Sequence, residues 1–504
     1  MKKISAAFMA MLLSFTLVSA ACSKKGPPRT TESGLDISKR VELVMYVIGS
    51  TPPKQAELME NFNKIALERL NCTLKVNWLA WGEYRNKYPL IFSSGEVFDM
   101  AYAATWLNFF SLAKRGAFKN LDELFPKYAP LNYARQSKTA LQQATVDGHI
   151  YAIPTLLATY SAYGPIYRAD LALPYGWDGK METFEDMERY FKIIKENHPA
   201  IEPFTVDARS AEMDDLWLYY HGIYPVKGAT NDFLFLDPAL PNPRLFTYWE
   251  YEKTPEFLAM MTRWNNAGYF IKSGLADTDS EKILNNKSAL RPHNIDTWEG
   301  YYIDRPEWDF RFNNFVKDVS NMAFTQDALV IPNTSKNPER ALALYELITS
   351  DEEVFRAFFF GIEGKSYEIQ IENGQEYVKR LNPDEYAFSN LWAARTREFM
   401  LPTVGSPADL PALKTGFDAV IKDGVNAQKF RSFVIDTSAI ETEYAACLNV
   451  HQQYWWPLEL GYVDSVSGLA EYREKMQTAG IERIREVLQK QLDEYLEDLE
   501  GVSK

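Results

Sequence analysis

The sequence predicts an α/β protein built from two or three domain-sized units. Its 504 residues are 46% apolar, and this length exceeds the size at which a single hydrophobic core stops growing. Short apolar strands alternate with amphipathic helices from residue 41 to residue 115. A second stretch of the same kind begins near residue 161. These three observations together favour at least two α/β units.

The first unit is expected to form a β-α-β-α-β arrangement with a mostly parallel sheet. Three short apolar segments are predicted strands: 41–47, 72–78 and 98–103. Three segments with helical spacing of apolar residues are predicted helices: 54–70, 82–93 and 106–115. Ligands of such sheets bind beyond the carboxyl ends of the strands. We therefore expect the loops 49–53, 79–81 and 104–106 to face a ligand.

The second unit is expected to begin after a turn and an extended strand at 147–154. It combines a strand at 161–167 with a helix that Thr183 caps. Further helices are predicted near 211–222 and 254–268. Later elements are a strand at 288–291, a strand at 328–331, a helix that ends near 350, and a helical stretch over the last forty residues. The repeated alternation predicts a second α/β core.

Composition excludes several classes of function. The net charge of −14 disfavours a general grip on nucleic acid. Three cysteines and five scattered histidines show no spacing typical of a disulfide framework or a metal site, so neither a metal nor a cofactor is expected. The sequence contains no nucleophile elbow, P-loop, dinucleotide fingerprint or His-Glu-x-x-His motif. No enzymatic activity is therefore predicted.

The N-terminus has the features of an export signal. Two lysines precede an apolar stretch, and small residues then lead to Cys22. Residues 1–21 are expected to be a signal peptide, and the Ala20-Ala21-Cys22 end resembles a bacterial lipobox. Cys22 would then carry lipid, and residues 22–39 would be a polar tether. Ser19 stands where lipoboxes usually have leucine, so ordinary cleavage near Ala20 is the alternative.

The order of several motifs resembles the extracellular solute-binding proteins of ATP-driven importers, within the group that binds oligosaccharides such as maltodextrins. D-G-x-I-Y-x-I-P at 147–154 looks like that family's crossing between two lobes, and Y-R-A-D-L at 167–171 looks like the motif that follows it. Residues 335–341 resemble the helix start that follows the return crossing in the same family. Two further segments, 361–367 and 479–493, look like a subgroup of lipoproteins of about this length with an extended C-terminal region.

This resemblance implies a two-lobed, type II periplasmic-binding-protein fold with a ligand cleft between lobes joined by hinge strands. Lobe one is expected to hold 40–155 plus 327–375, and lobe two 158–324 plus 376–504. Crossings are expected near 155–158, near 325–328, and between 365 and 390.

The resemblance also implies a function. A monomer anchored at the outer face of the cell membrane, on the extracellular or periplasmic side, would deliver an oligosaccharide to the transmembrane subunits of an ABC permease. Two alternatives remain open: a surface-anchored glycan-acting enzyme or adhesin, and a binding protein for peptides or another polar solute.

Aromatic platforms and hydrogen-bonding side chains are typical of sugar sites, and aromatic residues make up 14% of this chain. The residues expected to contact ligand are Trp81, Glu83, Thr105, Trp106, Tyr160, Asp214, Trp217, Asn294, Asp296, Trp298 and Trp392.

Several of these assignments have alternatives. The resemblance matches Trp298 to a family tryptophan that stacks on sugar, and we expect Trp106 and Trp298 to form platforms from different lobes. Trp106 could instead pack under the next helix, and Asn294 or Asp296 could cap a turn. Ala393-Ala394-Arg395 replaces the Gly-Asn pair that follows Trp392 in the subgroup.

Overall fold

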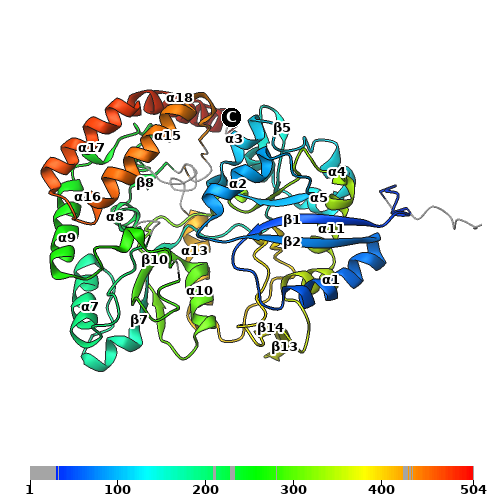
Figure 1. The fold of residues 1–504 in the computed structure, drawn as a ribbon, viewed down its shortest axis with the longest axis horizontal. Helices are drawn as coiled ribbons and strands as arrows, with labels where there is room; N and C mark the ends of the chain where they lie inside the picture. The colour runs from blue at the N-terminus through cyan, green and yellow to red at the C-terminus, as the bar shows by residue number, and fades with distance from the viewer. Residues whose placement is uncertain are drawn as a thin grey trace, which may run out of the picture.

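The computed structural model describes residues 30–502 except 32, 208–211, 227–232, 280, 424–429, 431–432 and 434. Two lobes lie side by side (Figure 1). The N-terminal strands belong to one lobe and the C-terminal helices to the other. Each lobe has its own large buried apolar core. The proposed signal peptide, Cys22 and the first part of the tether lie outside the described residues.

Lobe one is built on a five-stranded sheet of order β2-β1-β3-β12-β6. The strands are β1 (Val41–Ile48), β2 (Cys72–Leu79), β3 (Met100–Ala103), β6 (Ile153–Pro154) and β12 (Ala328–Val330). Strand β1 pairs in parallel with β2 and β3, whereas β12 runs antiparallel to β3 and β6. The parallel β1-β2-β3 core places the loops after β2 and β3 at one edge of the sheet.

Helices surround this sheet. They are α1 (Gln55–Leu70), α2 (Tyr84–Ser93), α3 (Phe109–Lys114), α4 (Leu124–Tyr128), α5 (Pro130–Arg135), α6 (Lys138–Gln143), α11 (Pro338–Ser350) and α12 (Glu352–Phe359). Two hairpins complete the lobe: β4 (Thr145–Val146) with β5 (His149–Ile150), and β13 (Tyr367–Glu372) with β14 (Gln375–Arg380).

Lobe two has a small antiparallel sheet of order β10-β7-β11, formed by β7 (Tyr163–Arg168), β10 (Leu290–Asn294) and β11 (Phe310–Phe312). A short pair, β8 (Tyr224–Pro225) and β9 (Phe235–Leu236), lies apart from it. The helices are α7 (Phe184–Asn197), α8 (Met213–Tyr220), α9 (Thr254–Ala267), α10 (Ile295–Asp304), α13 (Leu410–Asp423), α15 (Glu441–Val450), α16 (Trp456–Glu459), α17 (Ser465–Ala479) and α18 (Ile481–Val502).

Helix α7 shows how local sequence specifies this lobe. Thr183 accepts a hydrogen bond from the Asp186 backbone N–H at 3.1 Å, and the Asp186 carboxylate accepts one from the Thr183 N–H at 3.1 Å. This reciprocal cap satisfies two backbone donors at the helix start. The apolar stripe of the helix is buried in the core of lobe two.

Three chain segments cross between the lobes. The first two run side by side: Thr155 N–H donates to Asp327 O at 2.9 Å, and Ser161 N–H donates to Ser320 O at 2.8 Å. The third lies after Ala394, because Leu391, Ala393 and Ala394 still pack in the core of lobe one. We expected it between 365 and 390. The β13–β14 hairpin extends lobe one instead, and the chain enters the lobe-two core only at Leu410.

Within the residues that the structure describes, no helix is long and apolar enough to cross a membrane.

Candidate ligand-binding site

Three indole rings of lobe one form a stack, which we call the tryptophan stack: Trp81, Trp106 and Trp392. The Trp81 ring centroid lies 6.4 Å from that of Trp106 and 5.9 Å from that of Trp392, with interplanar angles of 26° and 25°. Trp81 follows β2 and Trp106 follows β3, so the parallel sheet brings their loops together. All three side chains are half-buried.

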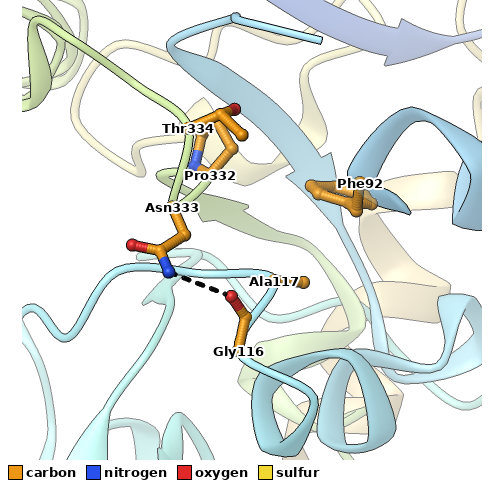
Figure 2. Close-up of a pocket in the computed structure, with 6 residues that line it drawn as sticks. All are labelled: Phe92, Gly116, Ala117, Pro332, Asn333 and Thr334. Carbon is orange, nitrogen blue, oxygen red and sulfur yellow. Dashed lines mark hydrogen bonds between the residues drawn. The ribbon is translucent and has the colours of Figure 1, made fainter. Parts of the chain in front are cut away.

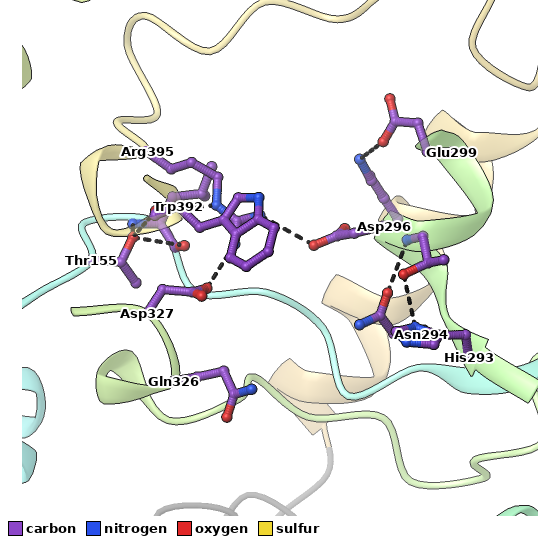
Figure 3. A network of polar contacts seen from close by, with 12 residues as sticks. Thr155, His293, Asn294, Asp296, Glu299, Gln326, Asp327, Trp392 and Arg395 are labelled. Atoms are coloured by element: carbon purple, nitrogen blue, oxygen red, sulfur yellow. Dashed lines mark hydrogen bonds and ion pairs between the residues drawn. The ribbon is translucent and has the colours of Figure 1, made fainter. Parts of the chain in front are cut away.

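A half-buried arginine lies next to Trp392 and links the two lobes. The Arg395 guanidinium donates to Asp327 at 2.6 Å and to Asp296 at 3.2 Å. Asp327 belongs to the crossing before β12, whereas Asp296 lies in the first turn of α10 in lobe two. Figure 3 shows Asp296 pointing from α10 toward Arg395, with Asp327 on the other side. We call these three residues the arginine bridge.

The charges of the arginine bridge compensate one another. Burial opposes the positive charge of Arg395, but the nearby Asp327 and Asp296 carboxylates outweigh it and raise the pKa of Arg395 above its usual value. Asp327 also accepts a hydrogen bond from the Tyr102 hydroxyl at 2.7 Å. The bridge is therefore a set of oriented donors and acceptors without excess positive charge.

The start of α10 provides polar groups from lobe two. The Asn294 side chain accepts a hydrogen bond from Thr297 N–H at 2.9 Å and so caps the helix. His293 Nδ1 lies 2.7 Å from Thr297 Oγ1 (Figure 3). The capping alternative for Asn294 is thus observed, whereas Asp296 faces the other lobe.

The remaining predicted contacts lie around this boundary. Thr105 Oγ1 donates to Gln326 Oε1 at 3.2 Å. The exposed Glu83 pairs with Lys87 at 2.7 Å on lobe one. The Tyr160 hydroxyl, on the first crossing, donates to Asp418 at 2.8 Å. Burial, followed by this hydrogen bond, raises the pKa of Tyr160 to about 12.

A pocket next to Thr105 is lined by both lobes. Its lining residues are Thr105, Tyr224, Pro225, Val226, Leu236, Met322, Ala323, Gln326, Phe430 and Phe433. Thr105 precedes Trp106 of the tryptophan stack, and Gln326 precedes Asp327 of the arginine bridge. Two of the pocket's lining residues are thus chain neighbours of the stack and of the bridge.

The prediction that Trp298 forms an exposed platform is wrong for this structure. The side chain is 2% exposed, its indole N–H donates to Phe310 O at 3.0 Å, and its ring stacks on Phe312 at 5.6 Å. The reason is that residues 295–304 form helix α10, and this helix turns Trp298 into the core of lobe two.

The prediction that Trp217 contacts ligand also needs correction. It is 5% exposed and packs against Phe184 and Phe257 inside lobe two, because it lies on the buried face of α8. The stack and the bridge do not include it.

Asp214 also serves the interior of lobe two. Its carboxylate accepts hydrogen bonds from the Tyr248 hydroxyl at 2.7 Å and from the Trp455 indole N–H at 2.8 Å. Burial, together with the charge of Asp215, raises the pKa of Asp214 above its usual value. Both donors therefore bind Oδ2 of the carboxylate that we expect to contact ligand.

Sequence reasoning missed Arg395, Asp327 and Gln326. These residues are local neighbours of Trp392 and of the second crossing, but their contacts with Asp296 and Thr105 join distant parts of the chain. The only indication of these contacts in the sequence is the charged Arg395, which stands near Trp392 where the subgroup has a Gly-Asn pair.

A different pocket lies on lobe one, lined by Phe92, Gly116, Ala117, Pro332, Asn333 and Thr334 (Figure 2). The Asn333 side-chain amide donates to Gly116 O across it at 3.3 Å. None of the residues predicted to contact ligand lines this pocket. In the described part of the chain, no group of three or more His, Cys, Asp or Glu side chains is arranged to hold a metal ion.

Two family models match the chain. The model described as "Bacterial extracellular solute-binding protein" matches residues 49–354, which is more than half of the sequence. A model described as "Domain of unknown function (DUF3502)" matches residues 429–497.

Similar proteins cover nearly the whole chain. A carbohydrate ABC transporter substrate-binding protein of Streptococcus pneumoniae is 25% identical over 489 residues, which are 93% of this chain and 94% of that protein. The crystal structure of the N-glycan transport solute binding protein NgtS from Streptococcus pneumoniae, in complex with Man1GlcNAc, has a TM-score of 0.77 at 24% identity and covers 91% of this chain and 100% of its own. The alginate-binding protein AlgQ2 has a TM-score of 0.61 at 15% identity over 90% of this chain and 98% of its own. The predicted two-lobed α/β fold is confirmed.

Proposed function

Because this chain belongs to the bacterial extracellular solute-binding protein family, we propose that it captures an oligosaccharide between its lobes and delivers it unaltered to the membrane subunits of an ABC importer. The observation that carries the proposal is the tryptophan stack beside the arginine bridge at the lobe boundary. Sugars present an apolar C–H face and a rim of hydroxyls, and these two groups of residues match those two features.

The charge of the site favours a neutral sugar. Arg395 is flanked by two carboxylates, so an anionic ligand would meet excess negative charge there. The half-buried indoles of the stack offer aromatic surface to a sugar face. The relatives support the same class: one is named a carbohydrate substrate-binding protein, and NgtS has been crystallised with Man1GlcNAc and with Man5GlcNAc.

The proposal includes the cell-surface setting. Lipid on Cys22 would hold a monomer at the outer face of the membrane, with residues 22–39 as a tether between the anchor and the lobes. Fractionation of cells that produce wild-type protein or Cys22→Ala tests this part, because only the variant should leave the membrane fraction.

A thermal-shift screen tests the ligand class. The screen contains neutral oligosaccharides, including Man5GlcNAc and kestose, together with alginate oligomers and short peptides. A neutral oligosaccharide at 100 times its Kd should stabilise the folded protein by about 2.7 kcal/mol. Mass spectrometry after prolonged incubation should return that oligosaccharide intact.

Other outcomes of this screen would contradict the proposal. Stabilisation by peptides or alginate alone would reject the neutral-sugar assignment. Turnover of the sugar that requires folded protein would reject a purely binding role.

A further inference from the structure

The C-terminal segment, defined here as residues 435–497, is an integral part of lobe two. It covers most of the region that matches the domain of unknown function. Its buried residues, such as Ile440, Cys447 and Leu458, share one core with α7 and α9. The backbone of Asp436 is held in place by Gln491 of α18. Asp436 N–H donates to Gln491 Oε1 at 2.9 Å, and the Gln491 side-chain amide donates to Asp436 O at 2.8 Å.

Acidic side chains of this segment contact helix α3 of lobe one. The Glu441 carboxylate accepts hydrogen bonds from the Ser111 hydroxyl at 2.7 Å and from the Arg115 Nε–H at 2.9 Å. Asp436 forms an ion pair with Lys114. Helix α3 and the C-terminal helices approach each other at the top of Figure 1.

The Lys114–Asp436 pair is partly shielded from water. The two side chains are 29% and 24% exposed. Burial opposes ionisation of Asp436, but the hydrogen bonds from Lys114 and Ser438 and the charge of Lys114 together outweigh it and lower the pKa of Asp436 below its usual value. Both groups therefore stay charged at neutral pH, and the attraction spans the two lobes.

Helix α3 belongs to the stretch of lobe one that carries the ligand site. Trp106 lies in the single helical turn Thr105–Leu107, three residues before α3 begins at Phe109. A contact that holds α3 against lobe two therefore also holds Trp106 at the lobe boundary.

We propose that the C-terminal segment is the closing element of this protein: Asp436 and Glu441 bind Ser111, Lys114 and Arg115 of lobe one when the lobes approach, and this contact sets the balance between open and closed forms. The contacts of Asp436 with Lys114, and of Glu441 with Ser111 and Arg115, each join one lobe to the other. Separating the lobes would therefore break all of them. Apparent affinity scales with the fraction of protein in the binding-competent form. The effect on affinity rests on the proposed function, whereas the effect on lobe separation does not.

Other ion pairs share the lobe boundary. Arg395 binds Asp296, and Arg380 of β14 binds Asp304 of α10. Removing the C-terminal contact should therefore shift the equilibrium toward the open form rather than abolish closure.

Small-angle X-ray scattering of the ligand-free full chain tests the proposal. The variant Lys114→Glu/Arg115→Glu places negative charges on both sides of the lobe boundary. Their repulsion should increase the radius of gyration. Adding Asp436→Lys/Glu441→Arg to this variant should restore the wild-type value, because both pairs re-form with exchanged signs. In wild type, 1 M NaCl should also increase the radius of gyration, since the Debye length falls to about 3 Å.

Matched variants keep the test decisive. In wild type, the Arg263 guanidinium lies 2.7 Å from the Glu188 carboxylate, and this ion pair is wholly within lobe two. Arg263→Glu places two negative charges there and should leave the radius of gyration unchanged. If the double reversal fails to fold, Asp436→Asn/Glu441→Gln removes the pairs without repulsion and should open the lobes. Wild-type dimensions in a folded variant that lacks both pairs, or no restoration by the exchanged charges, would overturn the proposal.

A binding arm connects closure to affinity. Calorimetric titration with Man5GlcNAc should show roughly 2- to 30-fold weaker binding for Asp436→Asn/Glu441→Gln, as two partly exposed pairs would give. If no oligosaccharide binds wild type while the scattering results hold, the proposed ligand class fails and the closing element stands. Unchanged affinity in an opened variant would overturn the link between this contact and binding.

Discussion

Trp81→Ala should weaken oligosaccharide binding by roughly thirtyfold or more. Trp81 contacts both other members of the tryptophan stack, so its removal withdraws one aromatic surface and the support of two more. Loss of a tryptophan at the centre of an interface commonly costs about 2 kcal/mol or more of binding free energy. Calorimetric titration of wild type and variant with the same glycan measures this change.

The fold should survive this substitution. Trp81 is half-buried at the edge of lobe one, so the melting temperature of the ligand-free variant should fall only slightly. Trp81→Phe keeps a flat ring and should lie between wild type and Trp81→Ala in affinity. Unchanged affinity in a folded Trp81→Ala protein would place the ligand away from the stack.

Trp298→Ala should lower the stability of the fold but leave the affinity for ligand nearly unchanged. The indole is 2% exposed and fills the core of lobe two between α10 and β11. Truncation of a buried tryptophan leaves a cavity and commonly costs about 3 to 5 kcal/mol of folding free energy. Urea unfolding should show this loss as a lower midpoint at similar slope.

A binding measurement distinguishes a core residue from a ligand contact at Trp298. Under conditions where Trp298→Ala is folded, its affinity should stay within about threefold of wild type, because the ring is buried in the core of lobe two. Trp298→Phe should recover part of the lost stability. A large loss of affinity with wild-type stability would restore Trp298 to the ligand site.

The fold could be predicted because its signals are local. Strands β1 and β2 are apolar runs between turn residues, and their observed bounds differ by one residue from the predicted ones. The cap of α7 by Thr183 was also readable, since capping depends on residues three positions apart. These patterns need no knowledge of tertiary contacts.

The site was only partly predictable. The loops after β2 and β3 follow from the parallel sheet, so Trp81 and Trp106 could be placed together in advance. The arginine bridge joins residues 296, 327 and 395, and no local pattern connects them. Whether Trp298 faces ligand or core depends on α10 packing on β11, which its own sequence does not specify.

Hydrogen exchange with and without ligand tests most directly that the sugar is held between the lobes. With Man5GlcNAc, or with the glycan that gives the largest thermal shift, amides at 79–84, 104–108 and 390–394 of lobe one should exchange more slowly. Amides at 293–299 of lobe two should become protected at the same ligand concentrations, because one molecule would contact both lobes. Protection confined to one lobe, or centred on the pocket at 116–117 and 332–334, would contradict capture between the lobes.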